Sequence, residues 1–228
     1  MKQILTCTIF LGLASSIGSA SVVYDNGGPN QISADNLSDT LIANDFTLLT
    51  ATTLTGFEFW NVELAGQYNG SITWFIFSNL AGIPGSTILA QGSASSAGQI
   101  TRTATGLTSV FISGDVEFDN VVNLSTSLTS GSLAFITGTY WLGLHNGPIG
   151  STSFLDFYWE TAANNGTNFG YGQELAAGLP WITPVSTLQE SAFKISDNVA
   201  AIPEPGTWAL MSAGLVALAS IRGKRANQ

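Results

Sequence analysis

The chain has 228 residues, of which 45% are hydrophobic and only 9% are charged, and its formal net charge at pH 7 is −9. Between residues 21 and 201, fourteen Asp and Glu side chains stand against two basic ones, Arg102 and Lys194, which gives a local net charge of −12. Such an acidic segment repels phosphate backbones and anionic lipids, so we expect no nucleic-acid partner. The simpler explanation of this acidic composition is that the negative charge keeps the domain soluble.

The first twenty residues have the pattern of a secretory signal peptide. Lys2 supplies a positive start, residues 4–13 form an apolar run, and residues 18–20 are the small residues Gly-Ser-Ala. We expect export and cleavage after Ala20, and an uncleaved anchor is the alternative. Because Cys7 lies inside this segment, the mature chain would contain no cysteine and would be exported without disulfides.

The segment 21–201 predicts a single all-β domain. It is rich in Gly, Ser, Thr and Asn, and its aromatic and β-branched residues recur in short runs between turn signals. The candidate strands are residues 22–24, 40–49, 57–64, 72–77, 87–90, 99–105, 110–113, 116–124, 139–145, 154–161 and 192–195. About ten strands at this spacing favour a two-sheet β-sandwich, jelly-roll-like in type.

One predicted strand changes its alternation phase. Phe57 and Phe59 share one face, whereas Trp60 and Val62 share the opposite face. Either a bulge re-aims the strand between Phe59 and Trp60, or both faces of the strand are covered.

Two later strands suggest a sugar-stacking surface. Trp141 and His145 share one face of the first strand, while Asp156, Tyr158 and Glu160 share one face of the second. If the aliphatic faces point inward, the opposite faces display aromatic rings beside polar groups, as glycan-binding platforms do. The platform requires the two strands to be neighbours in one sheet. The alternative is that these aromatic residues belong to the core.

Alternating carboxylates suggest a calcium site. Asp115, Glu117 and Asp119 would share one face of a strand, and carboxylate oxygens are typical calcium ligands. A solvated outer face is the alternative. His145 is the only histidine, so a multi-histidine metal site is excluded, and we expect no other cofactor.

The sequence predicts no catalytic residues. Asp156 and Glu160 would lie about 13 Å apart along a strand, which does not suit a glycosidase pair. No Gly-x-Ser-x-Gly motif accompanies the single histidine. A secreted hydrolase remains the alternative, with a partner such as Glu58 from another strand.

The end of the chain has three parts. Pro203, Glu204 and Pro205 precede an apolar run, residues 207–221, that contains no ionisable side chain. Arg222, Lys224 and Arg225 follow it directly. This order predicts a short transmembrane helix, inserted transiently in the inner membrane and stopped by cytoplasmic basic residues.

This arrangement resembles the PEP-CTERM sorting signal, which has a Pro-Glu-Pro motif, a short hydrophobic helix and a basic tail. The resemblance implies recognition by an exosortase, a membrane-embedded cysteine protease of Gram-negative bacteria that make exopolysaccharide. It also implies removal of the helix and release to the cell surface or the medium. The two prolines would keep the motif extended for a protease. A plain membrane anchor is the alternative.

The strands and turns between residues 44 and 160 are also similar to a β-sandwich type found in exported proteins with sorting tails, which implies a fold and no activity. Together these features predict a signal peptide at 1–20, a β-sandwich at 21–201 and a sorting segment at 202–228. The expected function is that of a non-enzymatic surface or biofilm-matrix protein associated with exopolysaccharide, with carbohydrate binding as its candidate activity. A passive adhesin or structural matrix protein is a further alternative.

Overall fold

The computed structural model describes residues 21–151, 156–162, 171–174, 181 and 190–197. These residues belong to one compact unit, Ala20–Asn198. The predicted signal peptide and the predicted sorting segment lie outside the described residues. Within the described ranges, no helix has the length and apolar character needed to cross a membrane.

The first of two antiparallel sheets is built around the long strand β4. Its path runs β1-β14-β4-β12-β2, and β8 and β10 also pair with β4 while β7 pairs with β8. The strands are β1 (Ser21–Asp25), β2 (Pro29–Asn36), β4 (Thr52–Glu63), β7 (Ile100–Thr108), β8 (Val116–Asn123), β10 (Ala134–Phe135), β12 (Phe157–Ala162) and β14 (Phe193–Asp197).

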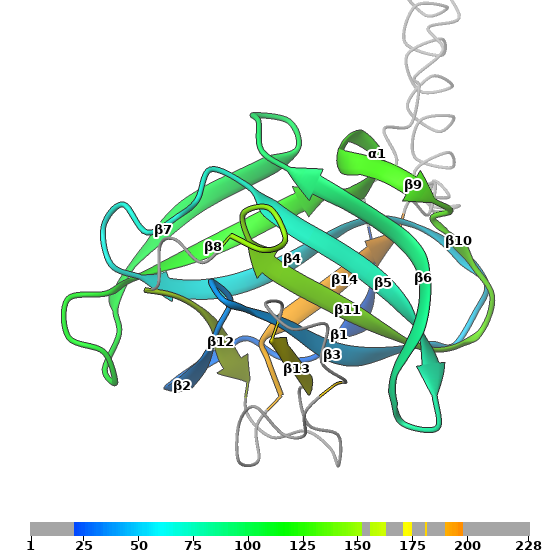
Figure 1. The fold of residues 1–228 in the computed structure, drawn as a ribbon, viewed down its shortest axis with the longest axis horizontal. Coiled ribbons are helices and arrows are strands. Elements are labelled where there is room, and N and C mark those ends of the chain that lie inside the picture. The colour runs from blue at the N-terminus through cyan, green and yellow to red at the C-terminus, as the bar shows by residue number, and fades with distance from the viewer. Residues whose placement is uncertain (1–20, 152–155, 163–170, 175–180, 182–189, 198–228) are drawn as a thin grey trace, which may run out of the picture. The chain divides into compact units, whose positions relative to one another are not determined.

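The second sheet has six strands in the order β13-β3-β11-β5-β6-β9 (Figure 1). Its strands are β3 (Thr40–Leu48), β5 (Ile72–Leu80), β6 (Ile83–Ala94), β9 (Leu128–Gly131), β11 (Gly138–Asn146) and β13 (Tyr171–Glu174). One short helix, α1 (Leu124–Ser127), connects β8 to β9 and begins at Asn123, whose side chain accepts a hydrogen bond from the Thr126 amide. The predicted β-sandwich is therefore confirmed.

The core between the sheets is dominated by aromatic side chains. Phe59 of β4 and Phe193 of β14 both contact Trp159 of β12 edge-on, with ring centroids 6.2 Å and 5.8 Å away. The facing sheet contributes Leu142 and Leu144 of β11, which are completely buried. Edge-to-face aromatic contacts add to the free energy gained by burying apolar area. The aliphatic faces of β11 and β12 therefore point inward, which is the condition that the platform hypothesis set.

Strand β4 is covered on both faces. Its register with β8 is continuous from Gly56 to Glu63, so no bulge separates Phe59 from Trp60. Phe57 and Phe59 face the core, while Trp60 and Val62, on the opposite face, are only 8% and 1% exposed. The phase change in the sequence reflects two buried faces and not a re-aimed strand.

Parts of the strand pattern differ from the prediction. The predicted strand at residues 110–113 is wrong, because the Ser109 hydroxyl accepts hydrogen bonds from the Phe111 and Ile112 amides and turns the chain. The sequence pattern also does not predict β2, β9, β10 and β13. Strand β2 lies at the end of its sheet path and is mostly polar, so it lacks the apolar alternation that identifies a strand.

Candidate functional site: the outer face of the eight-stranded sheet

The predicted sugar-stacking platform does not form. Trp141 belongs to β11 in the six-stranded sheet, whereas Tyr158 belongs to β12 in the eight-stranded sheet, so the two strands are not neighbours. The expectation of one shared surface is wrong because alternation gives a residue's face but not the sheet that contains it.

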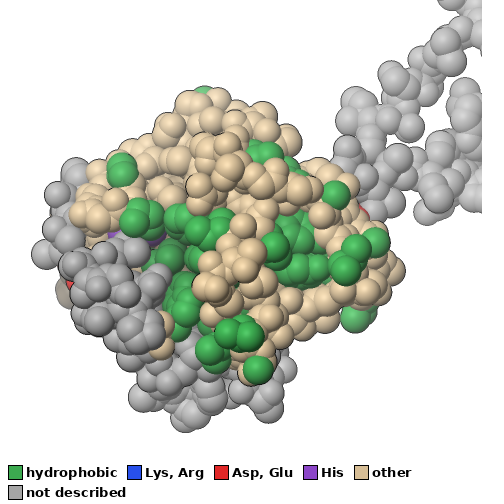
Figure 2. All heavy atoms as spheres, turned by 45° about the vertical axis from the view of Figure 1, so that its right-hand side comes forward, with side chains coloured by type: hydrophobic (Ala, Val, Ile, Leu, Met, Phe, Trp, Pro, Cys, Tyr) green, Lys and Arg blue, Asp and Glu red, His purple; other side chains and the backbone are tan. Residues whose placement is uncertain are grey.

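Trp141 is also not an exposed ring. It is 1% exposed and its indole N–H donates to the Asn79 side-chain oxygen at 3.0 Å. It lies in a second apolar cluster, on the outside of the six-stranded sheet, with Leu41, Ala43, Phe75 and Phe77. In Figure 2 hydrophobic side chains gather in the middle of the face that is drawn.

His145 is a buried structural residue. It is fully buried at the end of β11, and its Nδ1 donates to the Gly147 carbonyl at 3.0 Å. Burial lowers the pKa of His145, so the neutral imidazole is favoured. His145 therefore serves to hold the turn that follows β11.

Asp156 and Tyr158 do lie together, although they are separate from Trp141. The Tyr158 hydroxyl donates to the Asp156 carboxylate at 3.2 Å. Burial and this hydrogen bond both raise the pKa of Tyr158. Glu160 points to the same face of β12 but is completely buried.

The three alternating carboxylates of the predicted calcium site have different partners. Glu117 is in contact with Glu160, and Asp119 is in contact with Glu58. Burial raises the pKa of Asp115, and the negative charges of Asp156 and Glu63 raise it further. Within the part of the chain that the structure describes, no group of three or more Asp, Glu, His or Cys residues is arranged to hold a metal ion. The expected three-residue arrangement is therefore wrong, and calcium binding itself stays a prediction.

Glu117 and Glu160 form a carboxyl pair across β4. Strands β8 and β12 flank β4 on its two sides, where Glu117 and Tyr158 both pair with Val62. Glu117 is 2% exposed and Glu160 is 0% exposed. The pKa of Glu160 is raised to about 8. Burial is the largest cause and contact with Glu117 the second, while the backbone of Gln31 has a smaller, opposite effect. Neither carboxyl oxygen of Glu160 accepts a hydrogen bond of normal geometry.

Gln31 is held over this pair in an unusual conformation. Its φ of 57° lies in the left-handed region that few side chains adopt, and a register shift interrupts the pairing of β2 with β12 beside it. The Gln31 side-chain amide donates to Glu117 at 3.1 Å. Asn30 fixes the segment by donating to the Ala162 carbonyl and accepting from the Thr161 hydroxyl.

A second carboxyl pair, Glu58 and Asp119, lies on the same face. Lys194 approaches Glu58 to 3.8 Å and lies 5.1 Å from the ring centroid of Trp60. Burial raises the pKa of both carboxyl groups, and the charge of Lys194 lowers both. Because the Lys194 and Glu58 side chains are each 27% exposed, water screens this second pair.

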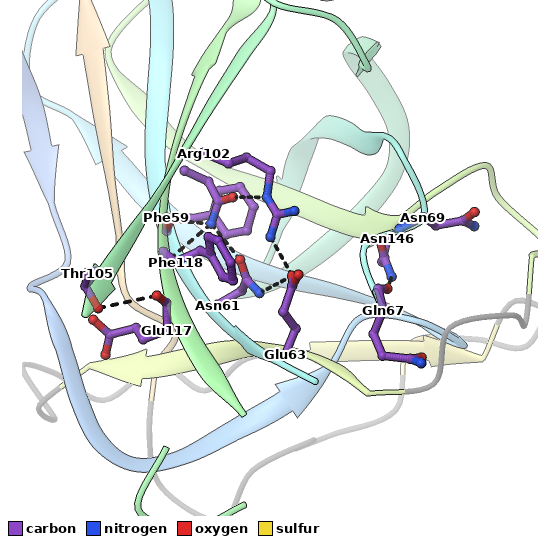
Figure 3. A network of polar contacts seen from close by, with 11 residues as sticks. Phe59, Asn61, Glu63, Gln67, Asn69, Arg102, Thr105, Glu117, Phe118 and Asn146 are labelled. Carbon is purple, nitrogen blue, oxygen red and sulfur yellow. Dashed lines mark hydrogen bonds and ion pairs between the residues drawn. The ribbon is translucent and has the colours of Figure 1, made fainter. Parts of the chain in front are cut away.

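The inner face of the same sheet carries a closed polar ring (Figure 3). Arg102 donates to Glu63 and to Asn120, Asn120 donates to Asn61, and Asn61 donates to Glu63. The Arg102 guanidinium lies 3.9 Å from the ring centroid of Tyr68. In Figure 3 the Glu117 side chain points away from this ring. Asn61 and Glu63 follow Phe57 and Phe59 at every second position, which is the signal that places them on the inner face.

The carboxyl pair does not have the geometry of a glycosidase. Retaining enzymes separate their two carboxyl groups by about 5–5.5 Å and inverting enzymes by more. Glu117 instead lies close enough to Glu160 to raise the pKa of that carboxyl group. Two carboxyl groups this close can share a proton or bind one cation.

Residues 201–225 match the family model described as the PEP-CTERM protein-sorting motif. No curated protein matches the chain. The match covers the Pro203-Glu204-Pro205 motif, the apolar run and all three basic residues that follow it. The chain therefore combines an antiparallel β-sandwich with a C-terminal PEP-CTERM sorting motif, which marks a protein for export and for sorting by exosortase.

Proposed function

We propose that this protein is a non-enzymatic component of the bacterial surface or extracellular matrix. Exosortase removes its C-terminal helix, and the released domain associates with exopolysaccharide. The observation that carries this proposal is the match of residues 201–225 to the PEP-CTERM sorting motif. The net negative charge of the domain favours its solubility outside the cell.

Sorting is tested with a variant of the motif itself. In the producing bacterium, replacing Pro203, Glu204 and Pro205 by alanine should leave the uncleaved chain in the inner membrane. The wild-type protein should appear outside the cell without its tail. Thr103→Ala, at an exposed position of β7, is the matched control and should behave like the wild type. Equal release of the motif variant and the control would contradict the proposal.

Exopolysaccharide association needs a surface other than the predicted platform. We place it at a hollow of about 240 Å³ over β5, β6 and β9. Its lining combines the ring of Phe75 with hydroxyl and amide side chains, and no side chain of the lining is ionisable; the lining residues are Thr73, Phe75, Gln91, Gly92, Ser93, Thr129 and Ile149. An aromatic ring beside neutral polar groups is suited to an uncharged sugar ring.

Binding is tested with the purified mature protein and polysaccharide from the producing bacterium. Gln91→Ala should weaken retention on the polysaccharide several-fold, because an amide that contacts the sugar is lost. Thr103→Ala, on the opposite sheet, should leave retention unchanged. If both variants bind like the wild type, the hollow is not the contact surface.

The absence of catalysis is tested in the same samples. Incubation of the polysaccharide with the mature protein should release no new reducing ends over the background. Release of reducing ends that is lost in Glu160→Gln would instead support the secreted hydrolase.

A further inference from the structure

The outer face of the eight-stranded sheet contains a buried carboxyl group that no basic side chain accompanies. Glu160 is completely buried, it faces Glu117, and neither of its carboxyl oxygens accepts a hydrogen bond of normal geometry. A buried carboxylate without a partner is among the most costly groups that a folded protein can contain. An unpaired group of this kind in a native fold therefore points to a missing ligand.

The protein has no cation of its own to place there. Between residues 21 and 201 the only basic residues are Arg102 and Lys194. Arg102 is bonded to Glu63 on the inner face, and Lys194 lies beside Glu58 in the second carboxyl pair. No basic side chain is therefore left for Glu117 and Glu160, and only protons or a cation from outside the chain can neutralise them.

We propose that Glu117 and Glu160 bind a calcium ion on the outer face of the eight-stranded sheet, with the side-chain oxygen of Gln31 as a third ligand. Two carboxylates balance the charge of one divalent cation. Calcium accepts carboxylate, amide and water oxygens in flexible geometry, whereas magnesium requires a nearly ideal octahedron.

Gln31 is placed for this role. Its amide nitrogen now donates to Glu117 at 3.1 Å, and rotation about the last side-chain bond would present the oxygen in its place. The Asn30 hydrogen bonds to Thr161 and to the Ala162 carbonyl hold the segment in position. The site is thus assembled from β2, β8 and β12, three strands that are distant in the sequence.

The proposal is independent of the exopolysaccharide surface, which lies on the other sheet. The mature protein, stripped of divalent ions with a chelator, is titrated with calcium chloride by isothermal calorimetry and melted with and without calcium. We expect one calcium per chain. The melting temperature should rise by about 5–10 °C when free calcium is about 100 times its dissociation constant. Magnesium at the same concentration should give a smaller rise.

Variants locate the site. Glu160→Gln and Glu117→Gln should each weaken calcium binding at least tenfold. Glu160→Gln should melt no lower than the wild type in chelator, because it replaces a buried ionisable group by a neutral amide of the same shape. Gln31→Ala should weaken binding less. Glu58→Gln, in the second carboxyl pair, is the matched control and should bind calcium like the wild type.

Two results would overturn the proposal. The first is a wild-type melting temperature that does not respond to calcium, which would leave a shared proton as the only partner of the pair. The second is a calcium response that survives in both Glu160→Gln and Glu117→Gln, which would place the ion elsewhere. If Glu160→Gln does not fold, the Glu117→Gln titration decides alone.

Discussion

Arg102 and Glu63 form an ion pair on the inner face of the eight-stranded sheet, across the intervening strand β8. Their side chains are 16% and 5% exposed. Arg102→Met would leave the Glu63 carboxylate buried without its cation, so we expect a loss of about 3–5 kcal/mol in the free energy of unfolding. Lys194→Met, in the more exposed pair, should cost at most about 1 kcal/mol. Urea denaturation of the two variants and the wild type measures both losses of stability.

The double variant Arg102→Met with Glu63→Gln checks the cause. It removes both charges, so it should recover a substantial part of the stability that Arg102→Met loses. If Arg102→Met lowers the free energy of unfolding no more than Lys194→Met does, then water reaches Glu63 and the polar ring does not stabilise the fold.

Trp141 should behave as a core residue although it lies outside the main core. Trp141→Ala should lower the free energy of unfolding by about 3–5 kcal/mol, because it opens a cavity among Leu41, Phe75 and Phe77. Tyr158→Ala, at a half-buried position, should cost less. Thermal and urea unfolding curves compare the two. A smaller cost for Trp141→Ala than for Tyr158→Ala would contradict this assignment.

Asp35 should make the protein less stable as the pH rises. Burial raises the pKa of Asp35 from 3.8 to about 7. The folded chain therefore binds more protons than the unfolded chain in this range. The contribution of Asp35 to the free energy of unfolding falls between about pH 4 and pH 7 and is flat above. The total fall should be roughly 2–4 kcal/mol.

Asp35→Asn separates this effect from that of Glu160. The variant should abolish most of the slope up to pH 7. In calcium-free buffer a slope of the same sign should remain up to about pH 8, because burial and Glu117 raise the pKa of Glu160 to that value. Urea unfolding at a series of pH values measures the slopes. An unchanged slope in Asp35→Asn would show that Asp35 is ionised at no cost in the folded protein.

Local alternation predicts which way a side chain points, and it does so reliably here. Leu142, Leu144, Phe157 and Trp159 all face the core, as their two-residue periods require. The two-sheet architecture also follows from many short strands separated by turns. These properties depend on neighbours within a few residues, so the sequence pattern contains them directly.

What covers a face depends on distant residues, which a periodic pattern does not contain. Trp141 lies on the outward face that the platform hypothesis assumed, but it is buried by Phe75 and Phe77 from β5. Glu117 and Glu160 come together only because β4 lies between their strands. The polar ring of Arg102 and Glu63 likewise joins β7 to β4. The pairing of strands decides such contacts, and single-sequence alternation leaves that pairing open.

Intact-mass spectrometry of the protein recovered outside the producing cell tests the central claim most directly. The predicted mass is that of a chain without residues 1–20 and without the apolar run and basic tail from residue 207 onward. The cleaved form should be absent from cells that lack exosortase. Recovery of residues 222–228 in the extracellular protein would contradict the account.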